Sequence, residues 1–209
     1  MRLEDCKIIY ICPDHNEKYQ KRKLHIEEML KGIGCTNFSH YKSSTEQYPK
    51  CLLNATIDIL QKNLDTPLII LEDDVEWTGI TEFVSDPSYD LVYLGLSKSG
   101  GDLTKNKHNG PSKFLLYNES QVRVINMLSA HAVYYPSRKG KEKIIEIFKA
   151  YSDKPYHIDV LLSRLQAFLV TIANKKPLFY QSAKYNTTNH EEVETKIQIT
   201  DSLEIIPYE

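Results

Sequence analysis

The sequence lacks any long apolar run. No segment of its 209 residues approaches the roughly 20 apolar residues that a membrane-spanning helix needs. The first residues, Met1 to Cys6, are polar and charged, so we expect neither a secretory leader nor a membrane span. Four N-x-S/T triplets begin at Asn37, Asn54, Asn118 and Asn186, and without a leader we interpret them as chance. We therefore expect a cytoplasmic protein.

Cysteine is scarce and shows no ligand spacing. The four cysteines, Cys6, Cys12, Cys35 and Cys51, include no C-x-x-C pair and fit no zinc pattern. Cys6 and Cys12 bracket an apolar segment, where reduced core thiols are expected. The spacing excludes a disulfide scaffold and a cysteine-ligated zinc site as the organising feature.

An excess of charge of one sign is also missing. Lys and Arg number 26 against 28 Asp and Glu, a net charge of −2, so we expect no nucleic-acid partner. The basic stretch Lys18 to His25 is followed at once by Glu27 and Glu28, which favours a solvated helix face, although local basicity can attract an anionic ligand. A hydrophobic content of 41% and a length of 209 residues predict one globular domain with a real core.

Apolar runs and helical periodicity alternate through the first third of the chain. Strands are predicted at 6–12 and 35–43 and at Leu68 to Leu71, with helices at 17–31 and 50–63 between them. This β-α-β-α-β order predicts an α/β fold, Rossmann-like, with a mostly parallel central sheet flanked by helices.

The rest of the chain continues the alternation less regularly. Strands are predicted at 89–96, 130–136 and in the late segments "LVTIAN" and "PLFYQS", with a hairpin around Asn118 and Glu119. Helices follow Ser137, a predicted N-cap, and Lys154. The loop 97–113 is long, and long loops in compact domains are usually functional or disordered.

The segment "PLIILEDDVEW", Pro67 to Trp77, carries the strongest chemical signal. An apolar strand runs straight into Glu72, Asp73 and Asp74, at the strand end where open α/β sheets place their ligands. On an extended segment Glu72 and Asp74 share one side and Asp73 faces the other. Adjacent acids repel, and one or two carboxylates plus ligand phosphates are the usual holders of Mg²⁺ or Mn²⁺. The alternative is a solvated acidic turn.

The order of these pieces resembles the GT-A glycosyltransferases, and within them family 25, the lipopolysaccharide and procollagen galactosyltransferase-like enzymes. The matching residues are Glu72-Asp73-Asp74, Leu94-Gly95, His131-Ala132, Ser137 with Gly140, and Ile158-Asp159. The resemblance covers roughly residues 7–165 and rests on the order and spacing of individually weak motifs.

Several positions depart from the family pattern. "KCLLNA" keeps Cys51 but has Asn54-Ala55 where the family has Ser-His, the Thr-His position is Ala130-His131, and "P-V-D" is "H-I-D". These departures concern the donor and the acceptor rather than the reaction type. The small size, short loops and Tyr/Lys/Asn-rich composition also resemble the capsid-glycosylating domains of large DNA viruses, a likeness of general appearance. For a viral protein the compartment would be the host cytoplasm.

The resemblance implies a metal-dependent transfer of a hexose from a nucleoside diphosphate sugar, with a UDP-sugar favoured. Its metal, Mn²⁺ or Mg²⁺, would be held by Asp74, with Glu72 on the same side and His131 as a possible third ligand. Asp73 would hold the ribose or the metal's waters. His131 lies in an apolar strand, where a hydrogen-bonded core histidine is the commoner outcome.

Asp159 stands at the start of a predicted helix and has two interpretations. An acid there is favoured by the helix dipole and needs no catalytic role. The resemblance implies instead a general base that takes the proton from the acceptor hydroxyl, as in an inverting enzyme.

The resemblance also places the nucleotide after the first strand. Pro13, Asp14, His15 and Asn16 would receive the base and ribose, Arg22 would contact the base or an anion, and Gly95 would lie by the cofactor. The alternative is a plain turn with a capping residue. For Trp77, the only tryptophan, a structural role is favoured over stacking on a sugar. Lys98, Lys105 and Lys107 would cover the diphosphate from the 97–113 loop.

We therefore predict a single GT-A-like glycosyltransferase domain acting on an acceptor hydroxyl of a glycan or glycoprotein. Residues 1–96 would form the nucleotide-sugar-binding half, 97–183 the acceptor and catalytic half, and 184–209 a surface tail. The alternatives are a metal-dependent nucleotidyltransferase or phosphohydrolase, which could also use the acidic triplet, and a non-catalytic nucleotide-sugar-binding module.

Overall fold

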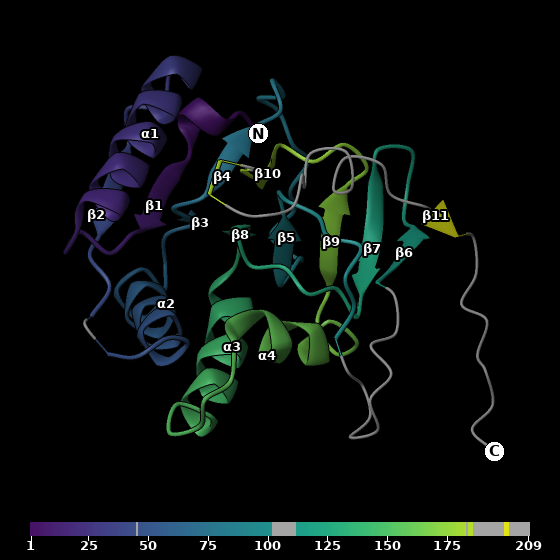
Figure 1. Ribbon diagram of the computed structural model, residues 1–209. Helices are drawn as coiled ribbons and strands as arrows, with labels where there is room; N and C mark the ends of the chain where they lie inside the picture. Colours follow the sequence, from purple (N-terminus) through teal and green to yellow (C-terminus); the bar gives the residue numbers. More distant parts are fainter. Residues whose placement is uncertain (45, 102–111, 183, 186–198, 201–209) are drawn as a thin grey trace.

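A nine-stranded sheet forms the centre of the computed structural model (Figure 1). The structure describes residues 1–44, 46–101, 112–182, 184–185 and 199–200. The strand order is β11-β6-β7-β9-β5-β8-β3-β1-β2, and a separate two-stranded sheet pairs β10 with β4. Ten strands have the bounds β1 Lys7–Ile11, β2 Phe38–Tyr41, β3 Leu68–Glu72, β4 Val75–Trp77, β5 Leu91–Tyr93, β6 Lys113–Leu116, β7 Gln121–Ile125, β8 Ala132–Tyr135, β9 Thr171–Asn174 and β10 Phe179–Gln181. The last, β11, is Ile199–Thr200.

The sheet is mostly parallel. Strands β7 and β8 run opposite to the other seven, because β8 pairs antiparallel with both β3 and β5, and β7 pairs antiparallel with both β6 and β9. The remaining neighbours pair in parallel. The predicted α/β class with a mostly parallel, helix-flanked sheet is confirmed.

Helices cover both faces of the sheet. Their bounds are α1 Glu17–Ile33, α2 Lys50–Lys62, α3 Arg138–Ala150 and α4 Ile158–Leu165, with a short 3₁₀ helix at Leu3–Asp5. Helix α1 lies on one face, while α2, α3 and α4 gather on the other (Figure 1). Ser137 is the N-cap of α3 as predicted, and its Oγ accepts from the amide of Gly140 at 3.1 Å.

Two hydrophobic cores result from strand alternation. In β3, Leu68 and Ile70 pack with α2, α3 and α4, while Ile69 and Leu71 pack on the opposite face with α1. Side chains alternate across a strand, so a strand buried on both faces must be apolar at every position. That requirement explains the continuous apolar run before Glu72.

Lys141 links α3 to the C-terminal end of α2 by hydrogen bonds. Its side chain is fully buried, and its Nζ donates to the carbonyl oxygens of Asn63, Leu64 and Thr66 at 2.8, 3.2 and 2.6 Å. Burial lowers the pKa of Lys141 to about 8. The three carbonyls satisfy the ammonium group while the ammonium caps orphan acceptors at the helix C-terminus.

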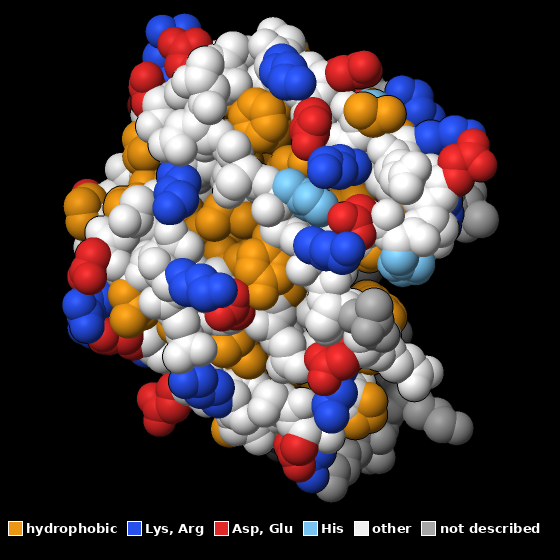
Figure 2. Space-filling model, turned by 90° about the vertical axis from the view of Figure 1, so that its left-hand side faces the viewer, with side chains coloured by type: hydrophobic (Ala, Val, Ile, Leu, Met, Phe, Trp, Pro, Cys, Tyr) orange, Lys and Arg blue, Asp and Glu red, His pale blue; other side chains and the backbone are white. Residues whose placement is uncertain are grey.

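The two predicted halves of the chain are interleaved in the sheet. β8 lies between β3 and β5, and β5 lies between β8 and β9, so residues 91–93 are enclosed by strands from the later half. Within the described ranges, no helix has both the length and the apolar character to cross a membrane. Figure 2 shows basic and acidic side chains interspersed over the face that carries α1 and β2.

Candidate active site

The acidic triplet forms the turn between two strands. β3 ends at Glu72 and β4 begins at Val75, so Asp73 and Asp74 make the turn. The amide of Glu72 donates to the carbonyl of His131 at 2.8 Å, and the amide of Ser182 donates to the carbonyl of Asp74 at 2.6 Å. The backbone of the triplet is thus held by the residue before β8 and the residue after β10.

Two cavities meet at Glu72. The first, here called the acidic cavity, has a volume of about 290 Å³ and is lined by Ile11, Pro13, Tyr19, Arg22, Ser43, Tyr48, Cys51, Leu52, Glu72, Asp73, Asp74 and Gln181. The second, the Asp159 cavity, has a volume of about 110 Å³ and is lined by Tyr48, Leu52, Glu72, Leu128, Ser129, Ala130, His131, Ile158, Asp159 and Gln181. Because four residues line both, the two cavities adjoin.

The carboxylates at this junction repel one another. Burial raises the pKa of Glu72 well above its usual value, and the nearby charges of Asp74 and Asp159 raise it further. Burial likewise raises the pKa of Asp159. A bound cation would reduce the electrostatic repulsion among these carboxylates.

No complete metal cage is present among the described residues, where no three His, Cys, Asp or Glu side chains are grouped to hold an ion. Mg²⁺ and Mn²⁺ commonly take only one or two carboxylates and complete their shell with phosphate and water oxygens. Glu72 and Asp74 both line the acidic cavity, so this donor set fits a divalent cation that arrives with a phosphate ligand.

Asp73 makes a different set of contacts from its neighbours. Its Oδ1 accepts from Arg22 Nη1 at 2.9 Å, and its Oδ2 accepts from Cys12 Sγ at 3.2 Å. The side chains of Arg22 and Asp73 are 11% and 9% exposed, so the ion pair is almost fully desolvated. Burial raises the pKa of Asp73, and the Arg22 charge opposes that shift. These contacts orient Arg22, and Asp73 also lines the acidic cavity.

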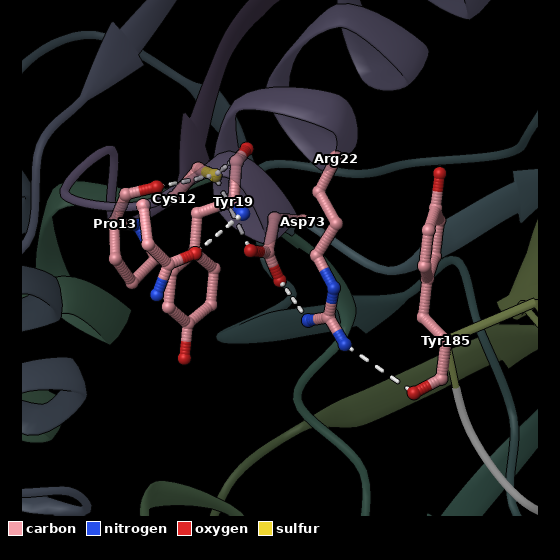
Figure 3. Close-up of polar contacts among 7 residues, drawn as sticks. Cys12, Pro13, Tyr19, Arg22, Asp73 and Tyr185 are labelled. Carbon is pink, nitrogen blue, oxygen red and sulfur yellow. Dashed lines mark hydrogen bonds and ion pairs between the residues drawn. The ribbon is translucent and has the colours of Figure 1, made fainter.

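Arg22 lies between aromatic rings as well as beside Asp73 (Figure 3). Its guanidinium carbon is 4.9 Å from the ring centroid of Tyr185 and 5.8 Å from that of Tyr19, and Nη2 donates to the carbonyl of Tyr185 at 3.3 Å. Helix α1 supplies Arg22 and Tyr19, and the chain after β10 supplies Tyr185. A fixed guanidinium facing a cavity is suited to a planar or anionic ligand.

Only part of the predicted nucleotide segment reaches the cavity. Pro13 lines it, whereas Asp14, His15 and Asn16 are not among its lining residues. Asp14 pairs with Lys42 at 2.7 Å, His15 packs against Tyr19, and Asn16 is the N-cap of α1, accepting from the amide of Tyr19 at 3.1 Å. For Asn16 the structure thus supplies the capping role.

His131 and Gly95 form a close pair beside the Asp159 cavity. His131 is 2% exposed, and its Nδ1 lies 3.0 Å from Ser129 Oγ. A Cβ added to Gly95 would lie 1.8 Å from His131 Nε2. The position therefore requires glycine so that the imidazole can reach the cavity wall, a role distinct from the predicted cofactor contact. Of the three predicted metal ligands, His131 borders the Asp159 cavity and not the acidic cavity.

Replacing Gly95 by alanine should destabilise the protein by about 1–3 kcal/mol, because the added methyl group overlaps the buried ring of His131. Chemical denaturation would measure the change. Gly32→Ala is the matched control, since a Cβ there meets nothing within 4 Å and the exposed helical position should gain about 0.5–1 kcal/mol. Equal effects of the two substitutions would contradict the assigned packing.

Asp159 lies in the first turn of α4, and His157 is the N-cap. The Asp159 Oδ1 accepts from the amide of Val160 at 2.7 Å, while the residue also lines its cavity. The Asp159 carboxylate can therefore contact the first turn of α4 and face the cavity at the same time. Trp77 has a structural contact, since its Nε1 donates to the carbonyl of Ile80 at 2.7 Å.

Several cavity residues were not predicted from the sequence. Tyr19, Tyr48, Leu52 and Gln181 lie in segments whose pattern indicates only helix, loop or strand. Only Gln181 could have been suspected, because it lies at the carboxyl end of a predicted strand. Of the loop residues predicted to cover a diphosphate, Lys105 and Lys107 lie outside the described residues, as does most of the 97–113 loop.

Comparison with known proteins gives likenesses of structure only. No protein-family model and no curated protein sequence matches the chain. One similar solved structure is a glycosyltransferase involved in the glycosylation of the major capsid of PBCV-1, with a TM-score of 0.48 and 13% identity over 82% of this chain and 90% of that one. Another is a UDP-glucose pyrophosphorylase complexed with UDP-glucose, with a TM-score of 0.47 and 12% identity over 86% and 78%.

A third is the nucleoside-diphosphate-sugar pyrophosphorylase from Vibrio cholerae RC9, with a TM-score of 0.44 and 13% identity over 79% and 70%. At such identities these likenesses concern the fold alone.

Proposed function

We propose that this chain is a glycosyltransferase that moves a hexose from a nucleoside diphosphate sugar, with UDP favoured, to a hydroxyl of a glycan or glycoprotein. The observation that carries the proposal is the junction of the two cavities at Glu72. One cavity offers acids and a guanidinium for a metal-bound diphosphate, and the other offers a buried carboxylate for an acceptor proton. The motifs that resemble family 25, including Ile158-Asp159, support the same assignment.

The roles follow from the position of each side chain. Glu72 and Asp74 would hold Mn²⁺ or Mg²⁺, which stabilises the negative charge that develops on a departing diphosphate. Arg22, oriented by Asp73, contacts the nucleotide part of the donor from the wall of the acidic cavity. Asp159 accepts the proton of the acceptor hydroxyl at the other side of the junction.

The transfer is a single displacement. A bond forms between the acceptor oxygen and the anomeric carbon as the bond from that carbon to the diphosphate oxygen breaks. The acceptor proton passes to the Asp159 carboxylate, and the nucleoside diphosphate leaves with the bonding electrons. An attack from the side opposite the leaving group inverts the configuration, provided that acceptor, carbon and leaving group are aligned.

Divalent metal and nucleotide should bind together. We expect calorimetry with UDP or GDP to show affinity at least about tenfold higher in Mn²⁺ than in EDTA, because two carboxylates otherwise face the diphosphate. Asp74→Asn should remove most of that gain, whereas Asp86→Asn, at an exposed position, should retain it. Equal affinity in EDTA would exclude the proposed metal site.

Product analysis separates the two enzyme classes. After incubation of UDP-glucose or UDP-galactose with Mn²⁺ and a panel of sugar acceptors, a transferase releases UDP. In a parallel incubation with added pyrophosphate, a nucleotidyltransferase instead converts the nucleotide sugar and pyrophosphate to UTP and the sugar 1-phosphate. Formation of UTP without UDP would exclude the proposed reaction even if the donor binds.

A further inference from the structure

The wall shared by the two cavities has a defined composition. Tyr48, Leu52, Glu72 and Gln181 line both, and here they are called the shared wall. A group that is attached to a diphosphate in the acidic cavity and faces Asp159 must lie against this wall. The shared wall combines an aromatic ring and an aliphatic side chain with a carboxylate and an amide, a mixture suited to a ring that bears hydroxyl groups.

The described lining of the Asp159 cavity carries acidic groups but no permanent cation. Among the residues that the structure describes, it contains two carboxylates, Glu72 and Asp159, and no Lys or Arg. The imidazole among these described lining residues, that of His131, has Nδ1 3.0 Å from Ser129 Oγ. The cation that Glu72 and Asp74 would hold is engaged by the diphosphate, so a sugar that itself carries a carboxylate would meet the like charge of Asp159, which costs binding free energy.

Tyr48 is held in place by the element that carries Asp159. Its hydroxyl lies 3.0 Å from Nδ1 of His157, and the two rings pack edge to face with centroids 4.9 Å apart. His157 is the N-cap residue of α4, two positions before Asp159. Tyr48 is nevertheless 60% exposed, so its ring is fixed but not enclosed by the core.

The phenol stays neutral in this setting. Partial burial, followed by the charges of Glu72 and Asp159, raises the pKa of Tyr48 to about 12. At neutral pH the hydroxyl therefore keeps its proton, which supports a stable contact with the imidazole of His157.

Building on the proposed function, we propose that the shared wall receives the transferred sugar, that this sugar is neutral rather than acidic, and that Tyr48 is the positioning residue against which its ring packs. His157 fixes the orientation of Tyr48, so the first residues of α4 position both the ring that contacts the sugar and the carboxylate of Asp159 that accepts the proton. The donors that fit are nucleoside diphosphate hexoses without a carboxylate.

Calorimetry in Mn²⁺ with UDP, UDP-glucose and UDP-glucuronate tests the charge requirement, and UDP-galactose with UDP-galacturonate provides a second pair. Within each pair the sugars differ only in oxidation at C6. We expect each uronate to bind at least about tenfold more weakly than its neutral partner. If UDP binds but the uronate binds as tightly as the hexose, the neutral-sugar inference is overturned while the proposed function stands.

Variants of the shared wall test Tyr48. Tyr48→Ala should lower the affinity for UDP-glucose by about three- to tenfold and leave the affinity for UDP unchanged, because only the sugar contacts the Tyr48 ring. Tyr48→Phe keeps the ring and loses the contact with His157, so its affinity for UDP-glucose should lie between those of the native protein and of Tyr48→Ala. Tyr117→Ala, at a half-exposed tyrosine of the β6–β7 turn outside both cavities, is the control and should change neither affinity.

The outcomes separate this inference from the function on which it rests. Failure of UDP and of GDP to bind in Mn²⁺ contradicts the proposed function and the inference together. Binding of UDP with no selective loss for UDP-glucose in Tyr48→Ala overturns only the assignment of Tyr48. A parallel loss of UDP and UDP-glucose in that variant would also overturn it, because it indicates a general disturbance of the acidic cavity.

Discussion

Asp159→Asn should lower the turnover of sugar transfer by about 10²-fold or more. Asparagine keeps the size of the side chain, and its amide oxygen can still accept from the amide of Val160, a contact that is 2.7 Å long in the native protein. What it cannot do is take the acceptor proton. Burial raises the pKa of Asp159, which makes the native carboxylate a stronger base than an exposed one.

Steady-state kinetics with a neutral UDP-hexose and Mn²⁺ would measure this effect, and calorimetry would measure donor affinity alongside it. We expect the donor affinity of Asp159→Asn to stay near the native value, whereas Asp74→Asn should lose metal-dependent affinity. Asp153→Asn, in the exposed turn before α4, is the matched control and should keep full activity. Full transfer by Asp159→Asn with only a lower Tm would show that Asp159 merely supports the helix.

Arg22→Met should lower the free energy of unfolding by about 3–5 kcal/mol, because it leaves the Asp73 carboxylate buried without its cation. Methionine preserves much of the aliphatic volume, so the loss reports charge rather than packing. Lys21→Met is the matched control on the same helix. Lys21 is 69% exposed, and among the described residues it pairs with Glu17 at the surface, so its removal should cost under about 1 kcal/mol.

A double-mutant cycle would confirm the source of the loss. Adding Asp73→Asn to Arg22→Met removes the unpaired charge, so the double variant should be more stable than Arg22→Met alone. The loss should also depend on pH. The pKa of Asp73 is already raised in the folded protein, and removing Arg22 raises it further, so between the unfolded and the folded pKa the folded state of Arg22→Met holds more protons than the unfolded state. Its stability should therefore fall as pH rises through that raised pKa, and a loss independent of pH would contradict the explanation.

The sequence predicts the elements well where packing alone decides them. The run Leu68 to Leu71 is apolar at every position because both faces of β3 are covered, and that pattern is visible without a structure. The N-cap at Ser137 and the hairpin around Asn118 depend on local chemistry and are equally readable. The strand order is not, since the antiparallel insertion of β8 between β3 and β5 depends on contacts between residues 40 to 67 positions apart.

The candidate site divides in the same way. The acidic triplet is visible because adjacent carboxylates after a buried strand are unusual, whereas Arg22 is indicated only by the resemblance, which places the nucleotide after the first strand. Tyr48 and Gln181 are not visible, because each reaches the junction only through the tertiary arrangement of a loop and of β10. Asn16 shows the opposite case, in which a residue next to a predicted ligand site serves as a helix cap.

The interleaved strand order also constrains how the chain acquires its structure during synthesis. β1, β2 and β3 can pair as soon as residues 1–72 are available. β5 follows them closely in sequence, yet both of its neighbours, β8 and β9, come from residues 132–135 and 171–174. The apolar segment 91–93 therefore has no strand to pair with until some 40 further residues have been made. During that interval it can associate with other exposed apolar segments. Glu72 and Asp159 can meet only once α4 has been made, so a nascent chain that ends before residue 158 holds the acidic triplet without Asp159.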